Sequence, residues 1–298
     1  MGVSVKIHSK DYRVRPGKKV DLGDWPTVGD PMCGSREQYR ERLEEHVRKL
    51  AALQQLHYAS ARSAVLVVFQ GMDAAGKDGA IRHVMSGINP QGCQVFSFKR
   101  PSEEELDHDF LWRTTRNLPA RGRIGIFNRS YYEEVLVVRV HPEILRAEAL
   151  PDGRPGEEGV WKGRYRSITD LEDHLHRNGT QILKFFLHLS RDEQRRRLVD
   201  RIDDPGKNWK FNDADVLERG HWKEYQKAYE ACLGSTSTQS APWYIVPADR
   251  KGDARLIVSH ILLETFKDLK MSYPHVGGKR RRELAETRKR LLGGKVSR

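Results

Sequence analysis

Cysteine, long apolar runs and an apolar leader are scarce or absent in this sequence. Its 298 residues include only three cysteines, which lie far apart and without metal-ligand spacing, as is typical of a reducing compartment. No run approaches the roughly 18 apolar residues of a membrane span, and the N-terminus lacks a signal-peptide pattern. These absences predict a cytoplasmic protein without a membrane-spanning segment. The three cysteines are predicted to have structural roles.

Positive charge is in excess, and it is unevenly distributed. The net charge is +12, and residues 279–298 alone hold nine Lys or Arg against two Glu, a net charge of +7. A basic excess predicts an anionic partner. Two interpretations of this basic tail stay open: a solvated helix that frays at the end of the chain, or a tether for a polyanion.

Strand and helix patterns alternate along the chain. Residues 1–34 carry three prolines and no sustained periodicity, which predicts an arm that wraps the domain. Residues 35–278 are predicted to form a single α/β domain, and residues 279–298 the tail. The alternation predicts a three-layer α/β/α fold with a mostly parallel central sheet. The predicted strands are 64–70, 94–98, 124–128, 181–189 and 243–246, and the predicted helices are 35–53, 102–117, 131–139, 213–233, 253–267 and two that begin at 169 and 190. Capping boxes predict two of these starts, one formed by Ser102 with Glu105 and one by Thr169 with Glu172.

A glycine-rich loop follows the first predicted strand. Residues 71–78 read GMDAAGKD and match G-x-x-x-x-G-K between a buried strand and a helical stretch. Backbone N–H groups of such a loop surround phosphate oxygens, the helix N-terminus adds positive charge, and Lys77 reaches the outer phosphates. The residues predicted to form this phosphate-binding loop are Gly71, Asp73, Ala74, Ala75, Gly76, Lys77, Asp78 and Gly79.

Two acids in this loop depart from the general pattern. Asp78 stands where a Ser or Thr hydroxyl normally binds Mg²⁺, and Asp73 lies inside the loop. Because two carboxylates beside a phosphate chain repel it, we expect a divalent cation, Mg²⁺ or alternatively Mn²⁺, to bridge them. Asp73 is the preferred metal ligand. Asp78 is either a second metal ligand or an acid at the helix N-terminus that the helix dipole stabilises.

The third predicted strand ends in Asn128-Arg129, where many P-loop enzymes place an acid. Arg129 lies at the carboxyl end of a strand, where open α/β sheets build their sites, and it could stabilise charge on a transferring phosphoryl group. A plain surface arginine is the alternative. The predicted catalytic residues are Asp73, Lys77 and Arg129, and Asn128 and Glu133 are further candidate metal ligands.

The chain around these residues resembles the polyphosphate kinase 2 family. The resemblance lies, in order, in FQGMDAAGKDGAI (69–81), FKRPSEEELDHDFLWR (98–113), FNRSYYEEVLVVRV (127–140), RRRLVDRIDDPGKNWKF (195–211) and APWYIVPADRK (241–251). It implies a P-loop kinase fold similar to thymidylate kinase, Mg²⁺ dependence, homo-oligomers, and reversible phosphoryl transfer between inorganic polyphosphate and ADP or AMP, with ATP among the nucleotides. Asn128 and Glu133 depart from the D-R-S-[WY]-Y-N form of many members and resemble the subgroup that accepts both AMP and ADP.

The residue chemistry agrees with a phosphate chain as donor. Such a chain carries about one negative charge per unit and needs a row of cations. Residues 190–215 are predicted to form a helical lid, although acids balance part of this stretch and a solvated helix face stays the alternative, mainly for Arg195 and Arg196. The predicted polyphosphate-binding residues are Arg129, Arg197, Arg201, Lys207 and Lys210. Related kinases suggest Arg100, Asp109, Arg113 and Glu133 as nucleotide-binding residues.

Two other functions share some of these features. An ATP-dependent nucleoside monophosphate-type kinase would have the same loop, but it would not require the row of cations. A nucleic-acid-binding P-loop ATPase would suit the basic composition, but no base-reading motif appears and Asn128 replaces the expected acid. Nucleic acid is therefore expected to bind only non-specifically, through the tail. No strong general base is needed, because the terminal phosphate oxygen of AMP or ADP is already anionic.

Overall fold

The computed structural model describes residues 5–148 and 157–293, which fold around a five-stranded sheet of order β2-β3-β1-β4-β5. All pairings between these strands are parallel, as expected for strands with long apolar runs buried on both faces. The strands are β1 (Ala64–Gln70), β2 (Cys93–Ser97), β3 (Ile124–Asn128), β4 (Thr180–His188) and β5 (Trp243–Pro247). All five predicted strands are confirmed.

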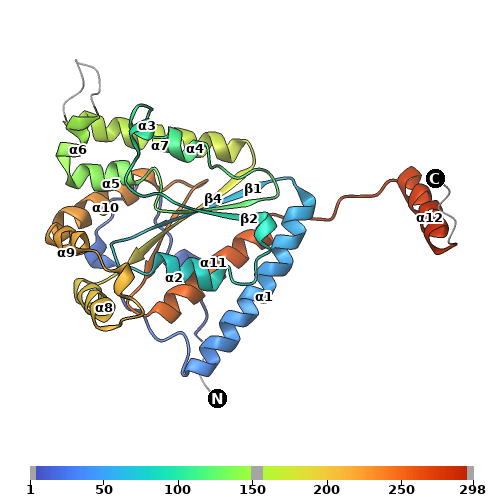
Figure 1. Ribbon diagram of the computed structural model, residues 1–298, viewed down its shortest axis with the longest axis horizontal. Coiled ribbons are helices and arrows are strands. Elements are labelled where there is room, and N and C mark those ends of the chain that lie inside the picture. Colours follow the sequence, from blue (N-terminus) through green and yellow to red (C-terminus); the bar gives the residue numbers. More distant parts are fainter. Residues whose placement is uncertain (1–4, 149–156, 294–298) are drawn as a thin grey trace.

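Helices cover both faces of the sheet (Figure 1). On one face α1 (Arg36–Ser60), α2 (Lys77–Val84) and α11 (Lys251–Asp268) pack together. On the other face lie α5 (Glu133–Val140), α7 (Glu157–Arg177) and α10 (Trp222–Thr236). Each face has its own apolar core, and the predicted three-layer α/β/α fold is confirmed. The other helices of the domain are α3 (Glu103–Leu106), α4 (Trp112–Thr115), α6 (Pro142–Ala147), α8 (Arg191–Asp203) and α9 (Asp213–Gly220), with 3₁₀ turns at η1 (Ser9–Asp11), η2 (Leu22–Asp24), η3 (Pro90–Gly92) and η4 (Asn208–Lys210).

Two long predicted helices are wrong because each one is interrupted. The segment 102–117 forms α3 and α4, separated by a turn in which the Asp109 carboxylate accepts the N–H of Leu111. The segment 213–233 divides into α9 and α10 at His221. The capping box predicted at Ser102 is confirmed, since its hydroxyl accepts the N–H of Glu105 and the Glu105 side chain accepts the N–H of Ser102.

The capping box predicted at Thr169 is wrong. Thr169 lies inside α7, and its hydroxyl donates to the carbonyl of Tyr165 in the preceding turn. Glu172, its supposed capping partner, is buried and forms an ion pair with Lys184 on β4. A serine or threonine three residues before a glutamate can therefore occur within a helix as well as at its start.

The N-terminal arm completes the edge of the sheet. The N–H of Val14 donates to the carbonyl of Trp243 at 2.9 Å, and the N–H of Ile245 donates to the carbonyl of Tyr12 at 2.8 Å. The arm thus adds an antiparallel bridge to β5 and covers its free edge. Its buried apolar side chains are Ile7, Val14, Val20, Leu22 and Met32.

The helix α12 (Gly278–Leu292) carries most of the basic tail and projects away from the sheet at the end of residues 270–277 (Figure 1). None of its described residues is buried. Within residues 5–148 and 157–293, no helix is both long and apolar enough to cross a membrane.

Candidate active site

The predicted site residues lie just after the carboxyl ends of three neighbouring strands. The glycine-rich loop follows β1, Arg129 follows β3, and α8 follows β4. Since β1 lies between β3 and β4, and Phe69 pairs with Asn128, the carboxyl ends of these strands meet. This is the switch point at which open α/β sheets bind ligands.

The loop takes its shape from backbone conformations that favour glycine. Gly71 has φ +155°, and a Cβ at this position would lie 2.9 Å from the carbonyl oxygen of Leu187. Gly76 has φ +101° and immediately precedes the first residue of α2. Larger residues would therefore strain both ends of the loop, and the N-terminus of α2 opens onto the cavity that the loop lines.

Lys77 folds back onto the loop. Its Nζ donates to the carbonyl of Gly71 at 2.6 Å and to the carbonyl of Met72 at 3.3 Å. Burial, with a further contribution from the nearby Arg129 charge, lowers the pKa of Lys77 to about 8. The ammonium therefore lies at the floor of the site, held by two carbonyls that a phosphate would have to replace.

Arg129 stands on a strained backbone. Its φ is +64°, a left-handed conformation that costs a non-glycine residue about 1–2 kcal/mol. Its N–H donates to the carbonyl of Phe69 at 3.0 Å, which ties the turn to β1. Its guanidinium donates to Asp73 at 2.7 Å and lies 3.7 Å from a carboxylate oxygen of Glu133. The two acids, Glu133 first, raise the pKa of Arg129 above its usual range. Asp73, Lys77 and Arg129 are thus brought together as predicted.

Asn128 contacts the other acid of the loop. Its side-chain Nδ2 donates to Oδ1 of Asp78 at 2.6 Å. In this arrangement the amide presents nitrogen, which does not bind metals, and it orients the Asp78 carboxylate. Within the described part of the chain, no cluster of three or more His, Cys, Asp or Glu side chains could hold a metal ion. Metal binding by Asp73, Asn128 or Glu133 stays a prediction.

Arg197 lines the cavity, but its donors have partners other than the phosphate chain predicted for them. This side chain is 3% exposed, and all five of its N–H groups have acceptors at 2.5 to 3.0 Å. No donor is left for a phosphate chain, and the guanidinium instead supports the loop from beneath. Residues 197 and 201 are four apart and share a helix face, but this spacing does not show that loop backbone packs against Arg197. The acceptors are Oε1 of Glu193 and the carbonyls of Ala74, Ala75, Ala248 and Asp249.

The other predicted lid cations line the cavity above the loop. Arg201 pairs with Asp215 at 2.9 Å, and Lys207 pairs with Asp204 at 2.6 Å. The cavity has a volume of about 720 Å³. Sequence reasoning missed several of its lining residues, because they come from separate elements of the chain. They are Arg82, Lys99, Lys251 and Arg255, with Asp215 opposite them. The spacing of Lys251 and Arg255, one helical turn apart, is a signal that could have identified those two.

The predicted nucleotide-binding residues divide between two places. Arg100 lines the main cavity, and Glu133 lies beside Arg129. Asp109 and Arg113 line a second pocket of about 310 Å³.

Buried charges form one wall of this second pocket. The guanidinium of Arg113 is buried and lies 3.4 Å from Glu134, and within the described residues its Nε has no hydrogen-bond partner. Arg164 lies 3.5 Å from the same carboxylate. Burial raises the pKa of Glu134 to about 7, against the opposing effect of the two arginines. A polar ligand group could therefore find both donors and an acceptor here.

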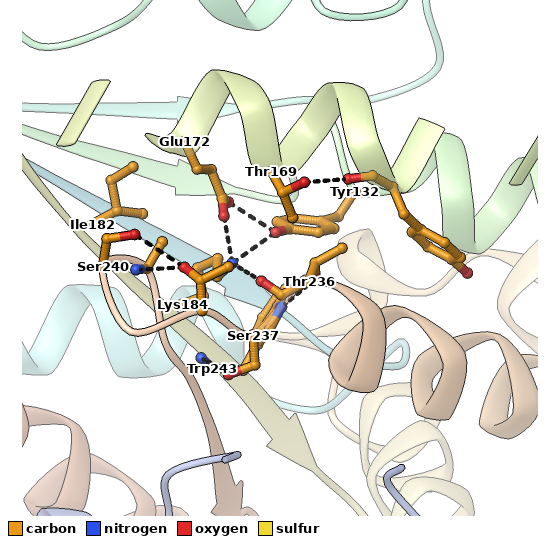
Figure 2. A network of polar contacts seen from close by, with 12 residues as sticks. Tyr132, Thr169, Glu172, Ile182, Lys184, Thr236, Ser237, Ser240 and Trp243 are labelled. Atoms are coloured by element: carbon orange, nitrogen blue, oxygen red, sulfur yellow. Dashed lines mark hydrogen bonds and ion pairs between the residues drawn. The ribbon is translucent and has the colours of Figure 1, made fainter. Parts of the chain in front are cut away.

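A buried polar network supports the turn that carries Arg129 (Figure 2). The Nζ of Lys184 donates to Glu172 at 2.5 Å, to the hydroxyl of Tyr132 at 2.9 Å and to the carbonyl of Thr236 at 2.7 Å. The hydroxyls of Tyr131 and Tyr132 both donate to Glu172 at 2.8 Å. These tyrosines follow Arg129 by two and three residues, so the network anchors the turn from behind. A lysine inside the apolar run of β4 is the sequence signal for it.

Comparison with known proteins identifies the family. A sequence model described as Polyphosphate kinase 2 matches residues 34–274. An ADP-polyphosphate phosphotransferase of Rhodopseudomonas palustris is 63% identical over 288 residues, covering 97% of this chain and 100% of that protein. An AMP/ADP-polyphosphate phosphotransferase of Meiothermus ruber is 46% identical and covers 89% of this chain and 95% of its own.

A solved structure has the same fold. The crystal structure of Polyphosphate Kinase 2 from Arthrobacter aurescens TC1 superposes with a TM-score of 0.84 at 35% identity. The match covers 95% of this chain and 99% of that one. Since sequence and fold agree over nearly the whole length, the chain belongs to the polyphosphate kinase 2 family.

Proposed function

We propose that this protein transfers the terminal phosphoryl group of inorganic polyphosphate to ADP or AMP, reversibly and with Mg²⁺. The observation that carries the proposal is the main cavity, in which the phosphate-binding loop, Arg129 and the lid cations meet. The relatives from Rhodopseudomonas palustris and Meiothermus ruber, which are named as polyphosphate phosphotransferases, support the same conclusion.

The charge of the cavity walls supports polyphosphate as the phosphoryl donor. Lys77 and Arg129 lie at the loop, and further cations line the cavity from both sides. A compact triphosphate needs a few such partners, whereas an extended phosphate chain needs a row of them. The further cations are Arg82, Arg201, Lys207, Lys210, Lys251 and Arg255.

The second pocket supports a nucleotide as the phosphoryl acceptor. Arg100 belongs to the main cavity and the following Pro101 to the second pocket, so the two lie next to each other. Small-molecule sites typically combine an apolar wall with a few polar groups. The second pocket has this combination, with the ring of Phe110 as apolar wall and Asp109 and Arg113 as polar groups. We propose that this pocket holds the nucleoside of the acceptor, with its phosphates directed toward Arg129.

The use of both AMP and ADP is part of the proposal. It rests on Asn128 and Glu133, which depart from the common family pattern. The relative from Meiothermus ruber, named as an AMP/ADP-polyphosphate phosphotransferase, gives it further support. We also expect homo-oligomers, which light scattering would measure.

Asp73 and Asp78 suit a magnesium ion that is shared with the substrate. Mg²⁺ commonly binds through one or two carboxylates together with substrate phosphates, and the loop offers two carboxylates. Mn²⁺ would suit the same donors. When bound, the ion would neutralise charge on the phosphates.

The catalytic work of the chain itself is positioning and charge stabilisation. The loop N–H groups and Lys77 bind the donor phosphates, with Lys77 exchanging its carbonyl partners for phosphate oxygens. Arg129, 39% exposed, exchanges Asp73 for the transferring phosphoryl group. The acceptor oxygen is already anionic, so no proton has to be removed before it attacks.

The test is to incubate the purified protein with ADP, Mg²⁺ and polyphosphate as the only donor and to measure ATP. We expect ATP to form, and we expect Lys77→Ala and Arg129→Ala to abolish its formation while circular dichroism stays unchanged. Arg195→Ala, on the exposed face of α8, is the matched control. If ATP serves as donor to AMP while polyphosphate does not, the protein is an ATP-dependent nucleotide kinase instead.

A further inference from the structure

The helix α12 concentrates positive charge in a way that the proposed active site does not use. Within the 15 residues of α12 there are seven Lys or Arg and two Glu. Only Arg280 has an ion-pair partner among the described residues, namely Glu283 at 3.0 Å. The helix is about 22 Å long at 1.5 Å per residue, so it presents about one cation per 3 Å. The cations are Lys279, Arg280, Arg281, Arg282, Arg288, Lys289 and Arg290.

These cations surround the helix. At 100° per residue, Lys279 and Arg290 point in nearly one direction, Arg281 and Arg288 in the opposite one, and the remaining three between them. The exposed Leu284, Leu291 and Leu292 are interspersed among them and do not form a separate apolar face. A helix that lies on a membrane needs separate polar and apolar faces, so this pattern argues against a membrane surface.

A flexible polyanion suits a helix that is charged on all sides. Such a chain can contact several faces at once, whereas a folded acidic protein would reach only one. Single-stranded nucleic acid is a flexible polyanion too, but its binding sites combine cations with aromatic side chains on which bases stack. The sequence of α12 contains no Phe, Tyr or Trp. A polyanion without bases therefore fits best.

We propose that α12 is a second binding site for inorganic polyphosphate, one that tethers long chains to the protein while their ends react. This inference rests on the proposed function, which brings that polymer to the protein. In Figure 1, α12 lies on the far side of the molecule from the lid helix α8. Only a long chain can therefore contact both sites at once. Holding its distant part raises the effective concentration of its end at the catalytic cavity.

The experiment compares two variants with the same loss of charge. The tail variant replaces Arg281, Arg282, Lys289 and Arg290 with Gln, which keeps helix propensity. The control variant replaces Lys49, Lys162, Arg166 and Arg177 with Gln, four exposed cations that already pair with acids elsewhere on the domain.

For each protein, KM and kcat are measured with short chains of about ten phosphates and with chains of several hundred, at low salt. We expect the tail variant to raise the KM for long chains about tenfold or more, because avidity is lost. Its kcat, and its KM for short chains, should match those of the wild type. The control variant should change neither value.

Several results would overturn the proposal. One is an unchanged KM for long chains in the tail variant, and another is an equal rise for both chain lengths. A third is loss of single-stranded RNA binding without any change toward polyphosphate, which would make α12 a nucleic-acid site. If the wild type forms no ATP even from short chains, the proposed function fails. The tail is then judged separately, by the binding of labelled long-chain polyphosphate without nucleotide, which the tail variant should lose and the control should keep.

Discussion

Arg129 and Arg197 lie at the same loop, but their guanidinium groups have different partners. Arg129 is 39% exposed and pairs with carboxylates, which substrate phosphates and a cation can replace. The side chain of Arg197 is 3% exposed and donates mainly to backbone carbonyls of the loop and of the residues after β5. At the residue scale, therefore, exposure and partner type separate the arginine proposed to meet the substrate from the one that supports the loop.

Replacing Arg197 with Lys should disrupt the loop even though the charge is kept. A lysine offers three donors from one nitrogen and cannot reach the carbonyls on both sides. We expect kcat to fall about tenfold or more and the free energy of unfolding to fall by about 2–4 kcal/mol. Arg196→Lys, next to it on the exposed face and also bonded to Glu193, is the control and should change neither. An Arg197→Lys variant with normal kcat would show that the loop holds its shape without this residue.

Lys77 should make the reaction sensitive to alkaline pH. Its pKa is lowered to about 8 in the free protein, so its positive charge disappears as the pH rises through 8. We expect kcat/KM for polyphosphate to decline above that pH. The effect of pH on folding stability has the opposite sign. The unfolded chain keeps this proton up to the usual pKa of 10.5, whereas the folded protein loses it near pH 8. The contribution of Lys77 to the free energy of unfolding therefore increases between pH 8 and 10.5.

Lys77→Arg provides the check, because arginine stays charged throughout this range. The variant should be slower but should lack the decline above pH 8. If the same decline persists in it, another group is responsible.

At the scale of elements, the turn between β3 and α5 depends on helices and strands that are distant in sequence. Lys184 lies in the middle of β4, Glu172 on α7 and Thr236 at the end of α10, and all three meet behind Tyr132. Both charges are completely buried, and both are hydrogen-bonded. The network therefore couples the packing of one whole face to the position of Arg129.

Removing one partner of this buried pair should be more harmful than removing both. Lys184→Met leaves the Glu172 carboxylate buried without its cation, which should lower the free energy of unfolding by about 3–5 kcal/mol. The double variant Lys184→Met with Glu172→Leu should recover a large part of that loss. Urea denaturation would measure both, with the exposed pair Lys162 and Glu158 as a control that should show no measurable change. A double variant as unstable as the single one would contradict this view.

At the scale of the whole molecule, the two ends of the chain differ in how they contact the domain. The described part of the arm, residues 5–34, places five apolar side chains in the core and hydrogen-bonds to β5. At about 1.5–3 kcal/mol for each buried side chain, its removal should cost about as much as the total stability of a typical domain, 5–15 kcal/mol. The helix α12 buries nothing among the described residues.

Deletion of residues 1–34 should therefore prevent stable folding, whereas deletion of residues 279–298 should change the free energy of unfolding by less than about 0.5 kcal/mol. Thermal unfolding and size-exclusion chromatography of the two truncated proteins would test this. A cooperative unfolding transition near that of the full chain after removal of the arm would contradict it.

The sequence by itself determined the order of the strands along the chain, the glycine-rich loop and the position of Arg129 at a strand end. These features depend on local patterns: a continuous apolar run predicts a buried strand, and glycine spacing predicts a phosphate loop. The same local patterns placed Arg129 at the carboxyl end of a strand, where open α/β sheets build their sites. All five predicted strands and the meeting of Asp73, Lys77 and Arg129 agree with the structure.

Only the tertiary structure decided which partner each polar side chain has. Arg197 was expected to face the donor, but it supports the loop, because helical spacing does not reveal which backbone packs against a face. Glu172 was expected to cap a helix, but it pairs with Lys184 in the core. The cavity cations on α2 and α11 share no motif with the loop. A charge acquires its role from residues far away in sequence, and those become its neighbours only when the sheet and its helices assemble.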